Sequence, residues 1–394
     1  MFNERFYSLG STRSVIRELF EYGKKRKAEI GDDKVFDFSL GNPSIEPPKS
    51  VNKSIIDLIE NTNSTLLHGY TSAQGDASVR LAIAESLNSR FNCGADANYI
   101  YMTCGAAASL TISLGAIVNS GEKVLALAPF FPEYKVFSET AGARFEVVKP
   151  MDDMTVDLDD FANKIDRTTK AVIINSPNNP SGVVYSKELI IKMAEILTKK
   201  SAEFNTRIFM IADEPYRELV YGDIEVPFIP NYYADTIVCY SYSKSLSLAG
   251  ERIGYIAVNP KMENAKELYL AICGAGRAFG YVCAPSLFQF VAKQNVSAKA
   301  LVEKYKENRD ILCDALSKMG YEFAKPDGAF YLFVKSPSKN GGEFCERAKK
   351  HEILIVDGKG FGVDTHARIS YCVSKEQIIN SIPAFEKLIS EYKN

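Results

Sequence analysis

One lysine, Lys244, stands among small hydroxyl residues in the segment 236–255, between two apolar runs. Both runs are rich in β-branched and aromatic residues, so we expect two buried strands, the second beginning at Arg252. A lysine between buried strands is expected to be more than a solvated surface charge. Ser241, Ser243 and Arg252 would place two hydroxyls and a guanidinium beside the amine, a combination that binds phosphate. Taken alone, the segment fits a polar loop with a locally paired arginine equally well.

Two more hydrophobic runs end in polar residues, within 170–182 and 207–216. Open α/β sheets bind ligands at the carboxyl ends of their strands, so these polar residues are expected to meet at one edge. Asp213 comes directly after five apolar residues, where a carboxylate is costly unless it meets a cation or a metal ion. A protonated pyridine nitrogen would satisfy this carboxylate.

A strand-to-helix junction is expected at Gly105, where the short apolar stretch 99–104 gives way to a long helical pattern. The amides of Gly105 and Ala106 would then be unpaired at a helix N-terminus, which is a phosphate-binding geometry. A tightly packed turn would select the same small residues, so the stretch alone leaves both interpretations open.

Taken in order, these motifs resemble those of the fold-type I pyridoxal-phosphate enzymes, specifically the class I and II aminotransferases. The motifs are the Gly105 loop, Asn-Asn-Pro-Ser-Gly at 178–182, Asp-x-x-Tyr at 213–216, and Ser-x-Ser-Lys at 241–244 followed by Arg252. Each is weak alone, but several in this order are specific, and the resemblance covers nearly the whole chain. It implies an α/β fold with a mostly parallel central sheet, helices on both faces, and a smaller α+β domain.

The length of 394 residues exceeds one ordinary core and predicts two domains. We expect a large cofactor-binding α/β domain at residues 46–290 and a small α+β domain formed by residues 1–45 and 291–394. Strand and helix patterns that alternate in the middle of the chain predict right-handed βαβ crossovers. An amphipathic helix capped by Ser11 and a long interdomain helix over 298–319 are also expected.

The composition, with 46% hydrophobic and 24% charged residues, is ordinary for a globular enzyme. A net charge of −2 argues against a nucleic-acid partner. No apolar run is long enough for a signal peptide or a membrane span, so we expect a cytoplasmic protein with no membrane partner. Eight cysteines without a C-x-x-C motif are expected to be free thiols, and three widely spaced histidines give no support to a metal site.

The resemblance assigns roles to the residues around the cofactor. It implies that Lys244 binds pyridoxal 5'-phosphate as an imine and, once the substrate amine displaces it, moves the proton at the substrate Cα. Asp213 would keep the ring nitrogen protonated, and Asn179 and Tyr216 would donate to the ring oxygen. The residues expected to anchor the phosphate are Gly105, Ala106, Ser241, Ser243 and Arg252.

Two aromatic residues complete the expected cofactor site. Phe131 occupies the position of the aromatic that stacks on the pyridine ring, although a core phenylalanine would fit the same pattern. Tyr70 resembles the tyrosine that reaches the cofactor phosphate of the neighbouring subunit, although an isolated tyrosine is more often core packing. Its assigned role implies a homodimer with shared active sites.

The expected substrate contacts are Gly41, Asn179 and Arg368. The Gly-Asn-Pro sequence from Gly41 resembles the loop that lies against the substrate carboxylate, and the alternative is a plain turn. Arg368 stands where the aminotransferase arginine clamps the α-carboxylate through two hydrogen bonds, and the alternative is a surface arginine paired across strands.

The identity of the amino acid and 2-oxo acid substrates is left open. Ala106 stands where aspartate-preferring bacterial relatives have a lysine. Neutral or aromatic amino acids are therefore expected to be tolerated, with apolar lining from Phe130, Phe131, Tyr281 and Phe361. Arg277 competes with this expectation, because it lies in the segment that supplies a distal-carboxylate arginine from the partner subunit in other aspartate-type relatives. It does not align cleanly with that position, and the alternative is an ordinary charge at a helix end.

Two other functions remain at this stage. A pyridoxal-phosphate-dependent lyase or decarboxylase would use the same Lys244 and Asp213 but cleave a different bond at Cα. A transcription regulator on the same fold would need a basic helix-turn-helix extension, and the 40 residues before Gly41 are too few for one.

Overall fold

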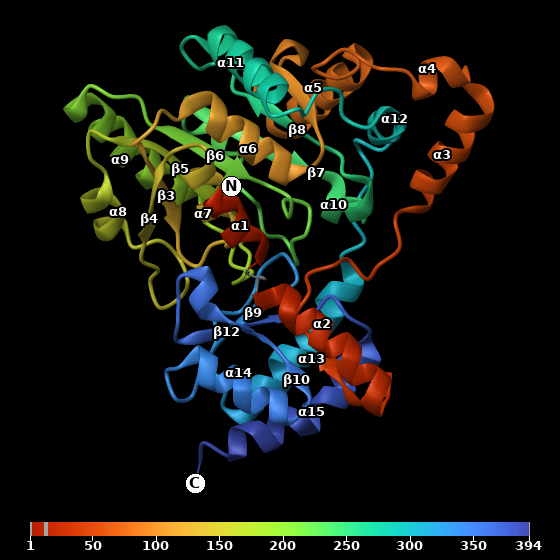
Figure 1. The fold of residues 1–394 in the computed structure, drawn as a ribbon, viewed down its shortest axis with the longest axis vertical. Coiled ribbons are helices and arrows are strands. Elements are labelled where there is room, and N and C mark those ends of the chain that lie inside the picture. Colours follow the sequence, from red (N-terminus) through yellow and green to blue (C-terminus); the bar gives the residue numbers. More distant parts are fainter. Residues whose placement is uncertain (1, 12–14, 394) are drawn as a thin grey trace.

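The computed structural model describes residues 2–11 and 15–393 and consists of two packed regions, stacked in Figure 1. The upper region is built on a seven-stranded sheet with strand order β2-β8-β7-β6-β5-β3-β4. Only β8 runs antiparallel to its neighbours, and the other pairs are parallel. The strands are β2 (Ile100–Thr103), β3 (Lys123–Leu127), β4 (Arg144–Val148), β5 (Thr169–Asn175), β6 (Phe209–Asp213), β7 (Thr236–Ser241) and β8 (Gly254–Val258).

Both faces of this sheet are covered by helices, because both faces of its strands are apolar. Along β3 and β5, alternate residues enter two different cores: Leu125 and Val172 pack into one, and Val124 and Ala171 into the other. The helices of this region are α3 (Lys49–Asn61), α4 (Ser64–His68), α5 (Ala77–Phe91), α6 (Ala106–Ile117), α7 (Glu133–Thr140), α8 (Leu158–Lys164), α9 (Lys187–Phe204), α10 (Tyr242–Ser245), α11 (Ala265–Ala278) and α12 (Ser286–Gln294). This is the predicted α/β class.

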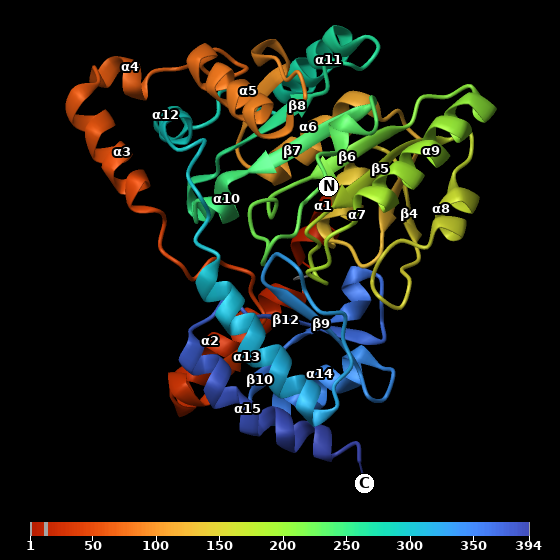
Figure 2. The same ribbon diagram turned by 180° about the vertical axis from the view of Figure 1, so that it is seen from behind.

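The lower region holds two small sheets and a layer of helices, as Figure 2 shows from behind. Strands β11 (Val356–Asp357), β12 (His366–Ser370) and β9 (Tyr331–Lys335) are antiparallel, and β1 (Phe36–Asp37) pairs with β10 (Ile353–Leu354) in parallel. The helices are α2 (Val15–Ile30), α13 (Glu303–Met319), α14 (Gly341–Lys350) and α15 (Lys375–Ser390). Tyr216 and Leu219, which follow β6, pack into this lower core. The division at residues 45/46 and 290/291 stays a prediction.

Short 3-10 turns join the elements, at Asp32–Lys34 (η1), Ala97–Tyr99 (η2), Ile229–Asn231 (η3), Ala249–Glu251 (η4) and Gly358–Phe361 (η5). Three expected boundaries were wrong. Ser11 is the last residue of α1 (Glu4–Ser11), not the cap of the next helix, which starts at Val15, and residues 12–14 lie outside the described residues. The helix expected over 298–319 begins only at Glu303, and Arg252 precedes β8 with a left-handed backbone (φ 54°).

Within the described part of the chain, no helix is long and apolar enough to cross a membrane. The same residues contain no group of three or more histidine, cysteine or acidic side chains that could hold a metal ion. All eight cysteines are free thiols, as predicted.

Candidate functional site

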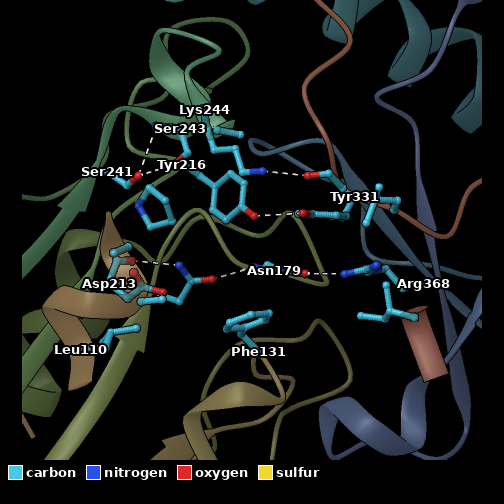
Figure 3. A pocket seen from close by; sticks show the side chains of 18 of the residues that line it. Leu110, Phe131, Asn179, Asp213, Tyr216, Ser241, Ser243, Lys244, Tyr331 and Arg368 are labelled. Atoms are coloured by element: carbon cyan, nitrogen blue, oxygen red, sulfur yellow. Dashed lines mark hydrogen bonds between the residues drawn. The ribbon is translucent and has the colours of Figure 1, made fainter. Parts of the chain in front are cut away.

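The predicted site residues converge on one cavity of about 300 Å³ between the two regions, at the carboxyl ends of β5, β6 and β7 (Figure 3). The predicted residues that line it are Gly41, Ala106, Phe131, Asn179, Asp213, Tyr216, Ser241, Ser243, Lys244, Arg252 and Arg368. Parallel strands end at one edge of a sheet, so polar residues that are far apart in the chain meet there.

Lys244 lies in the single-turn helix α10, directly after β7. Its Nζ donates to Gly41 O at 2.7 Å and lies 5.3 Å from the centre of the Phe330 ring and 6.0 Å from that of Tyr216. Burial disfavours the charged form and lowers the pKa of Lys244 to about 8. A substantial share of the amine is therefore uncharged near neutral pH, the form that attacks a carbonyl carbon.

Asp213 is the last residue of β6 and is buried. Its Oδ2 accepts a hydrogen bond from Tyr134 Oη at 2.5 Å, while Oδ1 has no hydrogen-bond partner among the described residues. Burial raises the pKa of this carboxyl to about 7. A buried oxygen without a donor is costly, so the site is suited to a cation that also donates a hydrogen bond.

The groups that could bind a phosphate lie beside Lys244. Ser241 Oγ and Ser243 Oγ are 2.6 Å apart, and the Ser243 amide donates to Ser241 Oγ at 3.1 Å. Gly105 precedes α6 with φ 86°, and no side chain caps this helix end. A Cβ at Gly105 would come within 2.9 Å of Arg252 Nη2, so the glycine lets the guanidinium approach the uncapped amides.

Arg368, on β12, is buried without a carboxylate partner among the described residues. Its Nη2 donates to Ser39 O at 2.6 Å, and its Nη1 donates to Asn179 Oδ1 at 3.2 Å. Its Nε has no hydrogen-bond partner in the described part of the chain. A buried guanidinium with an unused donor is suited to an anion such as a carboxylate.

Tyr216 is held by a group from a distant part of the chain, and the backbone of Asn179 by a nearby one. Tyr216 Oη is 2.9 Å from Tyr331 Oη, and a side chain at Gly41 would collide with that Tyr331 hydroxyl. The Asn179 amide donates to Asn175 Oδ1 at 2.8 Å. The Tyr216 hydroxyl and the Asn179 side chain, whose Oδ1 accepts from Arg368 Nη1, therefore each have a partner before any ligand binds.

Sequence analysis missed several residues of the site. No role was predicted for Tyr134, the partner of Asp213, or for Tyr331, the partner of Tyr216. Asn175 closes a strand at the predicted binding edge, which was the available signal. Ile16, Leu40 and Leu110 also line the cavity, and no local pattern marked them.

Six other predicted residues do not line the cavity: Gly105, which precedes the lining residue Ala106, and Tyr70, Phe130, Arg277, Tyr281 and Phe361. Tyr70 is 99% exposed, which leaves its predicted contact with a neighbouring subunit untested. Arg277 is exposed near the end of α11. Phe130 and Phe361 line a neighbouring cavity. Tyr281, the last residue of the expected apolar lining, is also outside the cavity, so of that set only Phe131 lines it.

Known proteins resemble this chain over most of its length. The family model for aminotransferase class I and II matches residues 33–384. A probable aspartate aminotransferase from Methanocaldococcus jannaschii is 27% identical over 387 residues, which cover 95% of this chain and 96% of that protein. The crystal structure of an amino transferase from Eubacterium rectale has a TM-score of 0.98 at 53% identity and covers 100% of both chains. That of an aspartate aminotransferase from Thermotoga maritima has a TM-score of 0.87 at 25% identity, over 99% of this chain and 100% of that one.

Proposed function

The chain belongs to the class I and II aminotransferases, and on this premise we propose which of its residues move an amino group between an L-amino acid and a 2-oxo acid with pyridoxal 5'-phosphate. The resemblance inferred from the order of the motifs is confirmed. The observation that carries the proposal is that Lys244 and the unpartnered oxygen of Asp213 belong to the same cavity.

Three features support pyridoxal phosphate as the cofactor. Asp213 Oδ1 lacks a donor, which a protonated ring nitrogen supplies. The glycine at 105 lets the Arg252 guanidinium approach the uncapped amides of α6, which suits a phosphate. Lys244 is the buried amine that can bind an aldehyde carbon. When bound, the cofactor supplies an electron sink for the negative charge that develops at the substrate Cα.

The side chains of the cavity are proposed to transfer the proton, to stabilise the charged cofactor ring and to bind the substrate. Lys244 Nζ, held near Gly41 O, removes the proton from the substrate Cα as a general base. Asp213 keeps its negative charge opposite the ring nitrogen, and Tyr134 fixes the orientation of this carboxylate. Arg368 binds the substrate α-carboxylate through Nε, which has no other partner among the described residues, and through an Nη group. The hydrogen bond from Nη1 to Asn179 Oδ1 is weakened or replaced when the carboxylate binds.

A homodimer with shared sites is part of the proposal. Tyr70 and Leu66 are 99% and 73% exposed, and α3 and α4 lie at the outer edge of the upper region in both overall views. The neighbouring loop adds Val282, 45% exposed, and is joined to the Tyr70 loop by a hydrogen bond from the Cys283 amide to Ala73 O at 3.4 Å. Apolar side chains gathered in this way on α4 and the two adjoining loops favour burial against another subunit.

Borohydride reduction followed by peptide mapping tests the cofactor assignment. The purified protein is expected to be yellow, to lose its visible absorbance on reduction, and to carry the label on Lys244. Lys244→Ala should abolish the label, and a matched change of an exposed lysine on α9, Lys192→Ala, should leave it unchanged. A label on another lysine, or on none, would show that the assignment is wrong.

A coupled assay tests the reaction. With an L-amino acid and 2-oxoglutarate, the protein should form glutamate and the 2-oxo acid of the donor in equal amounts. Release of carbon dioxide or ammonia without a new amino acid would instead identify a decarboxylase or a lyase.

A further inference from the structure

A second cavity, of about 700 Å³, adjoins the active site and is called here the side cavity. Ile16 and Phe131 line both cavities, so they are the boundary between them. The other walls come from the start of α7, from β4, from β11 and from the turn Gly358–Phe361. The side cavity is thus formed by residues of both regions of the molecule and is partly open to solvent.

Aromatic and aliphatic side chains form most of these walls. Phe130 and Phe145 pack edge to face with ring centres 5.3 Å apart, and Val147, Val356 and Phe361 complete the apolar lining. Burial of apolar surface against such walls is favourable in proportion to the area removed from water.

The charged residues that line the side cavity balance one another: Glu133 and Asp357 against Lys135 and Lys359. Asp357 Oδ1 also accepts a hydrogen bond from the Lys359 amide at 3.0 Å. The side cavity therefore contains no counterpart of Arg368, and it offers no net positive charge to a second carboxylate of a substrate.

The side cavity also lies close to Arg368, the residue proposed to bind the substrate α-carboxylate. The Phe361 ring, which lines the side cavity, lies 4.9 Å from the guanidinium carbon of Arg368. The Phe130 amide donates to Phe361 O at 3.0 Å, which ties the two regions together at this point. A substrate held by its α-carboxylate at Arg368 would lie one aromatic ring away from the side cavity.

The volumes indicate why a second space is needed. Sites for small ligands usually enclose about 300–1,000 Å³. The active-site cavity, at about 300 Å³, is at the lower limit of this range and would have to hold both the cofactor and the substrate backbone. It leaves little room for a large side chain, whereas the adjoining 700 Å³ would hold one.

We propose that the side cavity binds the side chain of amino-acid substrates that are large and uncharged, aromatic ones above all, with Ile16 as the residue that such a side chain packs against or displaces. This proposal rests on the proposed aminotransferase function and specifies its substrate class. Ile16 is suited to this position because it lies in the first turn of α2 and is only half-buried.

Gly360 allows the side cavity to be filled without straining the fold. It lines the side cavity, its φ lies outside the left-handed region, and a Cβ there would be 4.0 Å from its nearest neighbour, Pro132 Cγ. Gly360→Leu adds a side chain in the side cavity, and Gly360→Ala adds a smaller one. Ala202→Leu, at an exposed position of α9, is the matched control.

The first measurement is kcat/KM of the holoenzymes for phenylalanine and for alanine. Gly360→Leu should lower the ratio of phenylalanine to alanine by about tenfold or more, Gly360→Ala should lower it less, and Ala202→Leu should leave it unchanged. An unchanged ratio in both Gly360 variants would overturn the proposal, as would a wild-type enzyme that transaminates aspartate but not phenylalanine. If Gly360→Leu does not fold, Gly360→Ala decides the outcome.

Binding of 3-phenylpropanoate, which has the carboxylate and the ring but no amine, separates this proposal from the proposed function. It should bind the wild-type holoenzyme at least about tenfold more tightly than propanoate, and Gly360→Leu should remove this preference. If no amino acid reacts but the preference is observed, the aminotransferase assignment fails and the side cavity stands. If amino acids react but the preference is absent, the side cavity is not the subsite.

Discussion

The proposed function assigns the cavity around Asp213 and the exposed loop of Tyr70 to the same reaction, but it places only the first within a single chain. At the cavity, Asp213, Asn179 and Arg368 are buried and already held by hydrogen bonds within the chain. At the loop, Tyr70 is 99% exposed. The groups proposed to meet charge are held by contacts within one chain, whereas the role proposed for Tyr70 requires a second subunit.

The two places differ in where their contribution to catalysis comes from: groups fixed within one chain, or a residue contributed by another subunit. Dipoles and charges fixed in a dry site cost no reorganisation when charge develops, so the Asp213 side of the cavity should retain its properties in any assembly state. A residue contributed across a subunit boundary acts only in the assembled protein. The following changes test each half of the comparison.

Asp213→Asn should have the largest effect. The amide keeps the size of the side chain but not the charge opposite the ring nitrogen, so kcat should fall by about 10²–10³-fold while the cofactor stays bound. Steady-state kinetics and the absorbance of the bound cofactor measure the two effects separately. Near wild-type turnover in a variant that retains cofactor would contradict the assigned role.

Tyr134→Phe should have a smaller effect than Asp213→Asn, because it changes only the hydrogen-bond partner of Asp213. It removes one hydrogen bond to Asp213 and leaves its charge, so a loss of about tenfold is expected. A loss as large as that of Asp213→Asn would mean that Tyr134 does more than orient the carboxylate.

The reactivity of Lys244 in the cofactor-free protein should be set by burial within one chain. A lowered pKa means that the proton leaves at lower pH, so the reactive neutral amine should appear as pH rises through about 8. At pH 7 its neutral fraction should exceed that of an ordinary lysine by roughly 10²-fold.

The rate of pyridoxal-phosphate incorporation from pH 6 to 11 measures this reactivity. Lys244→Ala should remove the phase with the low midpoint. A midpoint near 10.5, the usual lysine value, would indicate that the amine is solvated.

Subunit mixing tests the other half of the comparison. If Tyr70 serves the neighbouring site, inactive Lys244→Ala and severely impaired Tyr70→Phe proteins should regain activity when mixed, because one site of each heterodimer is intact. Random exchange would restore about a quarter of the wild-type sites. Full activity in a protein that ultracentrifugation shows to be monomeric would contradict the shared site.

Arg277→Ala should have the smallest effect. Arg277 is exposed and lines neither the active-site cavity nor the side cavity, so turnover of aspartate and glutamate should change by less than about tenfold relative to alanine or phenylalanine. Loss of a buried partner of a substrate carboxylate would cost about 2–5 kcal/mol, and a selective loss of that size would make Arg277 the specificity residue.

Alternating strand and helix patterns predicted the βαβ crossovers, and polar residues at strand ends predicted one wall of the cavity that is proposed to bind the cofactor. The roles of those residues came from the family resemblance. Asp213 and Lys244 each follow an apolar strand, and parallel strands end at one edge, so their meeting follows from the sheet. Helix boundaries were less predictable, because the amphipathic pattern continues across Ser11, where α1 ends.

Only the tertiary structure decided which side chains face this wall. Tyr134 reaches Asp213 across 79 positions, and Tyr331 reaches Tyr216 across 115. Ile16 and Phe131 both line the two cavities, although one lies in the first turn of α2 and the other in the segment that precedes α7. No periodicity encodes such contacts, since they depend on how the two regions pack, while each residue taken locally is an ordinary tyrosine or isoleucine.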